Sequence, residues 1–249
     1  MRFHIVACEV LFREVAFYAA TADHVVDVTF VRKGLHDDPD LLRETLQKHI
    51  DSAEQVGLAE AIVLGYGLCS NGTAGLWTRK VPLVVPRAHD CITLFLGSRH
   101  RYVEVFSDRP GTYYYTSGWL ERGSDAVVEA QRSTTAVAGQ SFEELVARYG
   151  EDNARYLMEF QDSWRQRYTT VCYIRMPLSH KQQYCESVRK TAEENGWEYL
   201  ELEGDDRLIR AMARGEWNEE DFLVLQPGQR IRPSYDETVI CAGCSGGCA

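Results

Sequence analysis

The chain has 249 residues, of which 45 % are hydrophobic and 26 % are charged, so it has ample length and apolar content for a buried core. This composition excludes intrinsic disorder over most of the chain, and the formal net charge of -10 argues against nucleic-acid binding, since an acidic surface repels phosphates. The apolar run at residues 3–8 is too short for a signal peptide or a membrane span, so we expect a cytoplasmic protein with no membrane partner.

The first half of the chain alternates predicted strands and helices. Short apolar or alternating runs predict strands, and apolar residues at helical spacing predict the helices between them. The predicted strands are 3–8, 25–31, 61–64 and 81–85, and the predicted helices are 10–20 and 39–56. Asp38 or Asp40 is expected to cap the second helix and Gly57 to end it. This alternation predicts a parallel sheet flanked by helices.

The second half repeats the pattern after an aromatic segment at 107–123, which fits poorly into either sheet and predicts a lid or a contact between lobes. A helical stretch at 142–167, split by Gly150, joins the halves. Strands are predicted at 171–174, 197–202 and 222–225, and helices at 181–195 and 206–214. The predicted fold is therefore α/β, with two Rossmann-like lobes and a cleft between them. Its expected parts are an N-terminal lobe (1–106), a connection (107–168), a C-terminal lobe (169–235) and a tail (236–249).

Soft metal ligands follow three strands of the first lobe. Cys8 ends the first predicted strand, Cys69 follows the third, and His89 and Cys91 follow the fourth. Because ligands bind beyond the carboxyl ends of parallel strands, these side chains are expected at one edge. Thiolates and imidazole are ligands of zinc and other thiophilic ions. The sequence therefore predicts a metal held by all four residues, or by three of them with one position open for water or substrate.

Acidic side chains beside these ligands are candidates for catalysis. Asp90 or Glu9 could orient a ligand or act as a general base. Two alternatives stay open. The cysteines could act without metal, as in racemases that use two thiols, although Cys172 in the second half is expected inside a strand. They could also be small buried hydrophobes with no chemistry.

A glycine-rich loop at 65–75 is a candidate binding site for a small anionic or polar ligand in the cleft. Glycines allow close backbone approach, and exposed N–H groups can hold an anion. The expected ligand-binding residues are Gly67, Ser70, Asn71, Gly72, Thr73 and Arg87. The loop could equally be a tight turn. Arg87 could neutralise an anion or form a structural ion pair.

The C-terminal tail carries three more thiols, Cys241, Cys244 and Cys248, spaced C-x2-C-x3-C. The first pair has metal-ligand spacing, and three thiols could contribute to a metal site or hold an iron-sulfur cluster that takes a fourth donor from elsewhere. A disordered end is the alternative, because chain termini are poorly ordered unless they are tied down.

Several of these segments together resemble a known family. They are Ala7-Cys8-Glu9-Val10-Leu11, Gly34-Leu35-His36-Asp37, Leu64-Gly65-Tyr66-Gly67-Leu68-Cys69, Pro86-Arg87-Ala88-His89-Asp90-Cys91-Ile92, Leu96-Gly97-Ser98, Pro110-Gly111-Thr112-Tyr113 and Gly118-Trp119. Over about residues 3 to 230 the chain resembles the uncharacterised family called "domain of unknown function 1638"; the tail lies outside the resemblance. Similar proteins occur in anaerobes and methanogens, where corrinoid-dependent methyl transfer is common. The resemblance thus implies one-carbon metabolism, with a metal-thiolate transferase as the candidate enzyme. A non-catalytic partner of a corrinoid protein or methyltransferase is the alternative.

Overall fold

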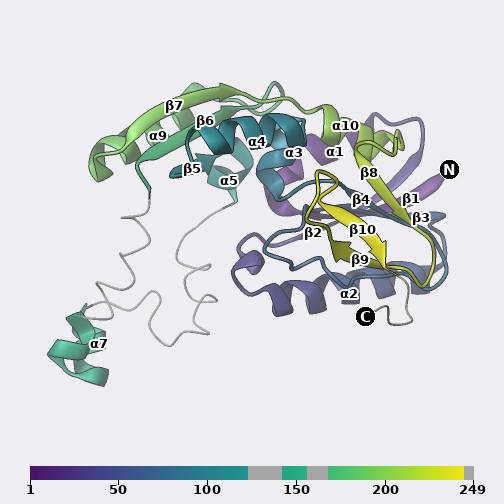
Figure 1. Ribbon diagram of the computed structural model, residues 1–249, viewed down its shortest axis with the longest axis horizontal. Coiled ribbons are helices and arrows are strands. Elements are labelled where there is room, and N and C mark those ends of the chain that lie inside the picture. Colours follow the sequence, from purple (N-terminus) through teal and green to yellow (C-terminus); the bar gives the residue numbers. More distant parts are fainter. Residues whose placement is uncertain (123–141, 156–167, 244–249) are drawn as a thin grey trace.

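The computed structural model describes residues 1–122, 142–155 and 168–243 (Figure 1). Its first sheet has five strands in the order β2-β1-β3-β4-β8. Strands β1 (Arg2–Cys8), β2 (Val25–Val31), β3 (Ala61–Gly65) and β4 (Leu83–Pro86) are parallel, and β8 (Phe222–Leu225) pairs antiparallel with β4. All residues of β3 and β4 are buried, as expected for central strands covered on both faces.

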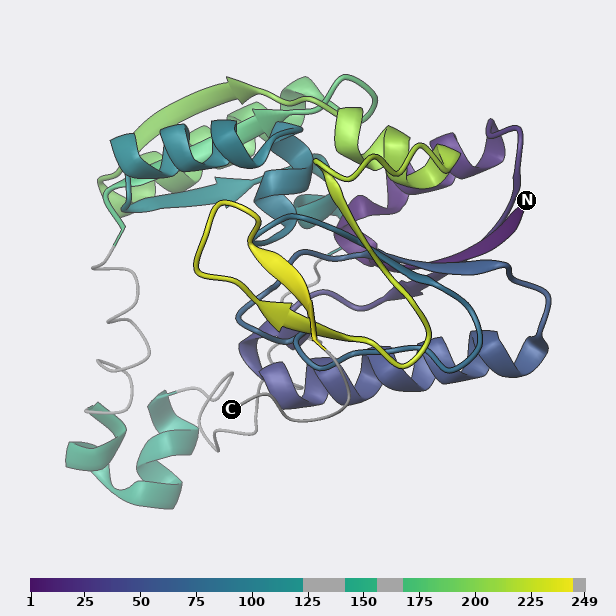
Figure 2. The same cartoon turned by 45° about the vertical axis from the view of Figure 1, so that its right-hand side comes forward.

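Helices cover both faces of this sheet. The 3-10 helix η1 (Glu9–Leu11) and α1 (Phe12–Ala20) connect β1 to β2, and α2 (Pro39–Val56) connects β2 to β3. Figure 2 shows α2 on one face of the sheet, and α1 beside α10 (Arg207–Arg214) on the other. The chain leaves β1 toward β2 and then returns past β1 to β3, so the topological switch lies between β1 and β3. Ligands bind at such a point in open α/β sheets.

The second sheet is fully parallel, with β5 (Thr112–Tyr115), β6 (Thr170–Arg175) and β7 (Glu198–Glu203) in sequence order. One face, with Val171 and Tyr173, packs on α9 (Gln182–Asn195). The other face, with Cys172 and Ile174, belongs to the same buried cluster as the first sheet. Helices α3 (Cys91–Leu96) and α4 (Arg99–Asp108) follow β4, and Leu94 and Phe95 of α3 lie in that cluster. The two sheets therefore share one hydrophobic core.

A mixed α/β fold with mostly parallel sheets flanked by helices is confirmed, with two corrections. The aromatic segment does not form a loop. Tyr113 to Tyr115 form strand β5, with Tyr114 packed against the main core and Tyr115 against the α9 side, and α5 (Ser117–Glu121) follows. The strand at 222–225 forms, but it joins the first sheet as its antiparallel member. Both differences have the same cause: β5 pairs with β6 and β8 pairs with β4, and local sequence patterns do not encode pairing between distant segments.

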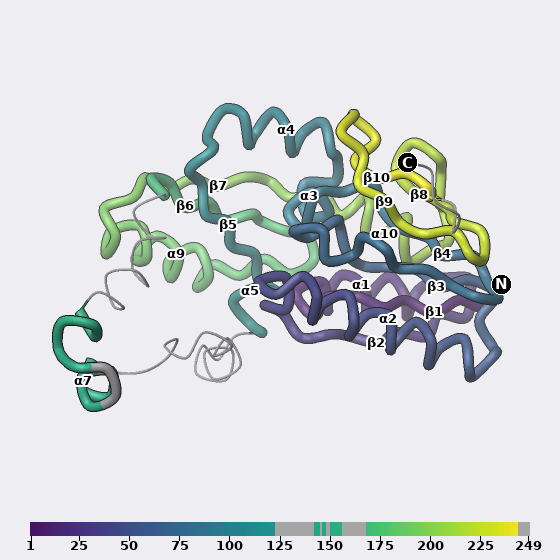
Figure 3. Tube along the Cα trace, turned by 60° about the horizontal axis from the view of Figure 1, so that its bottom comes forward, coloured from purple at the N-terminus to yellow at the C-terminus, as the bar shows by residue number. Residues whose placement is uncertain are grey.

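The C-terminal segment folds back onto the glycine-rich loop. Strands β9 (Arg230–Pro233) and β10 (Ile240–Gly243) form an antiparallel hairpin beside β8 (Figure 3). The N–H of Gly75 donates to the carbonyl of Ile231 (2.8 Å), and the N–H of Ile231 donates to the carbonyl of Leu76 (3.1 Å). The hairpin thus supports one side of that loop.

The expected helix at 142–167 is described only in part. Helix α7 (Phe142–Tyr149) ends at Gly150, which has a φ of 80°, so the predicted split occurs there. Residues 156–167 lie outside the described part. None of the described helices is long and apolar enough to cross a membrane. The expected part boundaries, the cleft and the cytoplasmic location stay predictions.

Candidate functional site

Three thiols lie at the carboxyl edge of the first sheet, on both sides of the topological switch. Cys8 is the last residue of β1, Cys69 follows β3 by four residues, and Cys91 begins α3 after β4. The thiols are close enough to influence one another's ionisation: Cys8 and Cys69 both raise the pKa of Cys91, and Cys8 raises that of Cys69. We call these three residues the thiol edge.

The loops that carry Cys69 and Cys91 are joined through their backbones. The N–H of Leu68 donates to the carbonyl of Ala88, and that of Cys69 donates to the carbonyl of His89, both at 2.8 Å. Gly67 makes this approach possible. A Cβ at Gly67 would lie 2.6 Å from the Asp90 nitrogen, which is closer than real Cβ contacts. Glycine is therefore required here for close packing of two loops.

Cys69 opens a left-handed turn made of residues that are not glycine. The φ angles of Cys69, Ser70 and Asn71 are 47°, 55° and 65°. For residues with a Cβ this conformation costs about 1–2 kcal/mol each. Arg43 stabilises the turn by donating to the carbonyl oxygens of Asn71 (3.1 Å) and Ala74 (2.6 Å). Strain of this kind is concentrated at functional sites, so the turn marks the thiol edge as a candidate site.

Burial keeps the three thiols protonated in the metal-free protein. Desolvation is the largest cause for each: it raises the pKa of Cys8 to about 11 and places the pKa values of Cys69 and Cys91 well above the usual value for a thiol. A thiol in this state is a poor nucleophile, because the thiolate is the reactive form.

Tyr66 places a buried polar group among the thiols. Its side chain is 4 % exposed, and its hydroxyl makes no hydrogen bond of normal distance and angle to any described residue. Burial, and then the charges of Cys8, Cys69 and Cys91, raise the pKa of Tyr66. A hydrogen bond between this hydroxyl and the Cys8 thiol, outside the usual distance and angle, also raises the pKa of Tyr66 and lowers that of Cys8. The hydroxyl of Tyr66 is therefore a buried polar group in direct contact with the thiol edge.

His89 and Asp90 have other contacts. The exposed ring of His89 stacks on Tyr102, with ring centroids 5.2 Å apart, and its charge acts on Asp90. Asp90 caps α3 by accepting hydrogen bonds from the N–H groups of Ile92 (2.9 Å) and Thr93 (3.3 Å), and it also accepts from the Tyr102 hydroxyl (3.1 Å). Burial raises the pKa of Asp90. The structure thus brings Asp90 to the thiol edge as a helix cap, and it gives His89 an aromatic neighbour.

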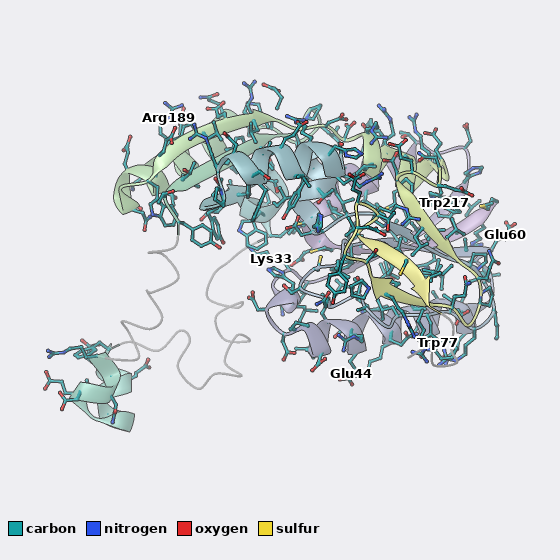
Figure 4. The ribbon with its side chains drawn as sticks, viewed as in Figure 1. Lys33, Glu44, Glu60, Trp77, Arg189 and Trp217 are labelled. Atoms are coloured by element: carbon teal, nitrogen blue, oxygen red, sulfur yellow. The ribbon has the colours of Figure 1, made fainter. Side chains whose placement is uncertain are left out.

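Glu9 and Lys33 lie on the Cys8 side of the edge. The Glu9 carboxylate accepts a hydrogen bond from the backbone N–H of Lys33 at 2.9 Å. The Lys33 ammonium donates to the Trp119 carbonyl at 3.0 Å and lies 4.6 Å from the centre of the Trp119 ring. Lys33 is labelled in Figure 4. Both charges act on Cys8: Glu9 raises the pKa of its thiol and Lys33 lowers it. Sequence reasoning missed Lys33 although it follows β2, a position that the strand-end rule could have flagged.

The expected ligand-binding residues of the glycine-rich loop mainly hold the turn together. A Cβ at Gly72 would lie 2.5 Å from a methyl carbon of Leu42, so this glycine packs on α2. The Thr73 hydroxyl donates to the carbonyl of Gly67 at 3.1 Å. Ser70 and Asn71 are exposed at the surface beside Cys69. These two side chains, rather than the glycines, are the ones that a ligand at the thiol edge could reach.

Arg87 binds backbone carbonyls of the C-terminal segment. Its guanidinium donates to the oxygens of Glu219 (3.1 Å), Thr238 (3.3 Å) and Ile240 (2.6 Å). Cys241, exposed on β10, is close enough for its charge to act on Arg87, while Cys244 and Cys248 lie outside the described residues. Arg87 therefore ties the start of the cysteine tail to the loop after β4.

Replacing Arg87 with methionine is expected to loosen the hairpin. Hydrogen bonds from a charged donor are worth about 1.5–3 kcal/mol, so we expect a lower free energy of unfolding and faster amide exchange over 230–243. Denaturant unfolding and hydrogen exchange measure both. Arg189→Met, at an exposed arginine on α9, is the matched control with little expected change. Unchanged exchange in Arg87→Met would show that the carbonyl contacts do not hold the hairpin.

Fold and site together define an α/β protein with a thiol-lined candidate site at the topological switch of its larger sheet. The chain belongs to the family described as "Protein of unknown function (DUF1638)", whose model matches residues 30–213. The match includes Cys69 and the His89-Asp90-Cys91 segment, and it excludes Cys8 and the β9-β10 hairpin. The comparisons found no match among curated proteins or among solved structures.

Proposed function

We propose that this protein binds a soft metal ion, zinc or another thiophilic ion, through the thiolates of Cys8, Cys69 and Cys91. The observation that supports the proposal is the electrostatic coupling of three thiols, delivered by three neighbouring parallel strands, around the buried hydroxyl of Tyr66. Soft ions prefer sulfur donors, so this set of side chains fits such an ion in its chemistry.

To bind one metal ion together, the three thiols have to change their side-chain torsions so that the sulfur atoms face one another. Within residues 1–122, 142–155 and 168–243, no group of three or more His, Cys, Asp or Glu side chains is arranged to hold a metal ion. Each cysteine has a single side-chain torsion, so its sulfur can change direction while the backbone stays in place. Binding would release the thiol protons, because a metal takes the thiolate form.

Metal binding is favoured over metal-free thiol catalysis. A general base or nucleophile needs a thiolate near neutral pH, and burial opposes that at all three positions. Of the described thiols of the second half, Cys172 is fully buried in β6, Cys185 is 3 % exposed in α9, and Cys241 is exposed on the β9-β10 hairpin, so the second sheet offers no exposed thiol to pair with the first set. A two-cysteine racemase therefore fits the arrangement less well.

The wider proposal is a metal-thiolate transferase or accessory protein of one-carbon metabolism. A bound thiophilic ion would supply an activated thiolate or a Lewis acid. Glu9 or Asp90 would orient ligands beside it. This wider proposal includes a corrinoid protein or methyltransferase as partner and a cytoplasmic location. It also includes a cleft between two Rossmann-like lobes and an iron-sulfur cluster at the tail. They rest on the sequence and on the resemblance.

Cobalt titration tests the proposed site. We use the full-length chain, reduced and anaerobic, with Cys244→Ser and Cys248→Ser so that the tail cannot bind the probe. We expect one equivalent of Co²⁺, with sulfur-to-cobalt charge-transfer absorption and proton release. Cys69→Ser should lower the affinity roughly 100-fold or more, since even outer-shell changes cost 10- to 100-fold.

The matched control is Cys185→Ser, which removes a buried thiol of the second sheet. We expect it to bind Co²⁺ as the parent does. Equal affinities of the Cys69→Ser and Cys185→Ser variants, or no charge-transfer band in the parent, would rule out the thiol edge as a metal site.

A further inference from the structure

The first sheet leaves one long edge uncovered within the described part of the chain. Its strand order ends at β2, and none of the described strands pairs with the outer side of β2. The N–H of Val25 donates to the carbonyl of Met1 (3.2 Å), so Val25 and every second residue after it bond toward β1. The N–H and carbonyl groups of Val26, Val28 and Phe30 therefore point away from the sheet. They form a row of donors and acceptors for a further strand.

The other edges of the two sheets are covered, short or charged, which are the usual ways in which proteins prevent edge strands from pairing. The β9-β10 hairpin lies beside β8, β5 has only four residues, and β7 carries Glu198, Glu201 and Glu203. In contrast, β2 has seven residues with no proline or lysine among them. Its one charged residue, Asp27, pairs with Arg2 of β1 at 2.8 Å. Strand β2 is thus the edge best suited to pairing with another strand.

Apolar side chains lie along the same edge. Val26, Val28 and Phe30 pack against the main core and stay partly exposed. The ring of Phe30 contacts that of Phe12 on α1, with centroids 4.9 Å apart, and Phe12 is 37 % exposed. Val25, at the start of the strand, is 55 % exposed. An added strand would cover this apolar surface and would also satisfy the outward backbone groups.

We infer that β2 pairs with β2 of a second copy of this chain, antiparallel, so that the two first sheets join into one. This inference goes beyond the proposed function and does not depend on a metal ion. Two-fold symmetry is the commonest form of self-association, and an axis perpendicular to the strands makes them antiparallel. With the axis at Val28, all seven residues of β2 are paired. Val26 of each copy then lies opposite Phe30 of the other, a favourable cross-strand pair.

Charge complementarity favours a second copy in this orientation. Asp23 precedes β2 and Arg32 follows it, and both side chains are exposed. In the antiparallel pair, Asp23 of each copy lies beside Arg32 of the other, so the edge is complementary to itself at both ends. A parallel second copy would instead place like charges side by side, which is unfavourable. At the centre, Asp27 of each copy lies opposite Thr29 of the other, so the two carboxylates do not face each other.

Sedimentation velocity of the reduced, full-length chain over a range of concentrations tests this inference, and we expect a dimer. Arg32→Glu should weaken dimerisation at least about tenfold, because the new carboxylate meets Asp23 of the other copy at both ends. Adding Asp23→Arg to that variant should restore the dimer, since the two charges are then exchanged. Val25→Lys should also weaken the dimer. Its matched control is Val103→Lys, at a valine of α4 that is 51 % exposed, and we expect no change there.

Amide hydrogen exchange identifies the edge that pairs. In the dimer the outward N–H groups of Val26, Val28 and Phe30 should exchange slowly, and in Arg32→Glu they should exchange fast. The N–H groups of Asp27 and Thr29, which bond to β1, should stay slow in both. A monomer at every concentration would overturn the inference, and slow outward groups in that monomer would show that another segment of the chain covers β2. A dimer that Arg32→Glu and Val25→Lys both leave unchanged would overturn it too, because that dimer would form through another surface.

Discussion

Replacing Gly67 with alanine is expected to abolish metal binding and to destabilise the fold by about 1–3 kcal/mol. The added methyl would lie 2.6 Å from the Asp90 nitrogen and 2.8 Å from the Ala88 carbonyl oxygen. Both atoms belong to backbone and cannot rotate away, so the loops that carry Cys69 and Cys91 must separate. Overpacking of a rigid site typically costs 1–3 kcal/mol.

Denaturant unfolding and the cobalt titration measure the two effects. Gly196→Ala is the control, since Gly196 ends α9 at a φ of 67° with nothing within 4 Å of an added Cβ. That variant should lose about 1 kcal/mol through backbone strain alone and bind Co²⁺ normally. Wild-type cobalt affinity in Gly67→Ala would mean that close packing of the two loops is not needed for the site.

Local signals predicted the first sheet well. Strand 25–31 and helix 39–56 were placed at their observed ends, because Asp38 accepts a hydrogen bond from the Leu41 N–H and Gly57 adopts the left-handed conformation, as their residue types predict. The alternation of strands and helices predicted a parallel sheet, and the observed order β2-β1-β3-β4-β8 was not predicted. In contrast, β5 is only four residues long and β8 pairs antiparallel across most of the chain, so no local period identified their partners.

The position of the three thiols was also within reach of the sequence, since each follows a strand that ends at the same edge. The rest of the site depends on contacts between distant segments. Asparagine tolerates positive φ, but nothing local predicts that Cys69 and Ser70 adopt it, because the turn is held by Arg43 from α2. Trp119 reaches Lys33 only because α5 packs on η1 at Gly118. Tyr66 lies between two glycines directly after a buried strand, and this position predicts a side chain at the thiol edge.

A second buried polar group lies between α1 and the second sheet. Glu14 is fully buried; its Oε1 accepts a hydrogen bond from the Ser179 hydroxyl at 2.5 Å, and its Oε2 has no partner among the described residues. Burial is the largest cause that raises the pKa of Glu14, and the charge of Asp206 raises it further, while Ser179 and Arg13 oppose the shift. The folded protein therefore holds a proton on Glu14 that the unfolded chain releases at lower pH.

The raised pKa of Glu14 determines whether the free energy of unfolding rises or falls with pH. Below the ordinary pKa of a glutamate, about 4.3, both states are protonated and Glu14 adds no pH dependence. Between that value and the raised folded pKa, unfolding releases a proton, so the free energy of unfolding falls as pH rises. Glu14→Gln mimics the protonated acid. We expect it to match wild type at pH 4 and to be more stable than wild type at pH 8, measured by urea unfolding at each pH.

Glu54→Gln provides the matched control, with the opposite sign. Glu54 is also buried, but its carboxylate accepts hydrogen bonds from the backbone N–H groups of Arg79 (2.9 and 3.0 Å) and Lys80 (2.7 Å). Removing that charge weakens charge-assisted bonds, so this variant should be less stable than wild type at neutral pH. The contrast between two buried glutamates isolates the effect of an unpartnered oxygen. If Glu14→Gln and wild type lost stability in parallel from pH 4 to pH 8, Glu14 would already be ionised in the folded protein, and its burial would be compensated by its neighbours.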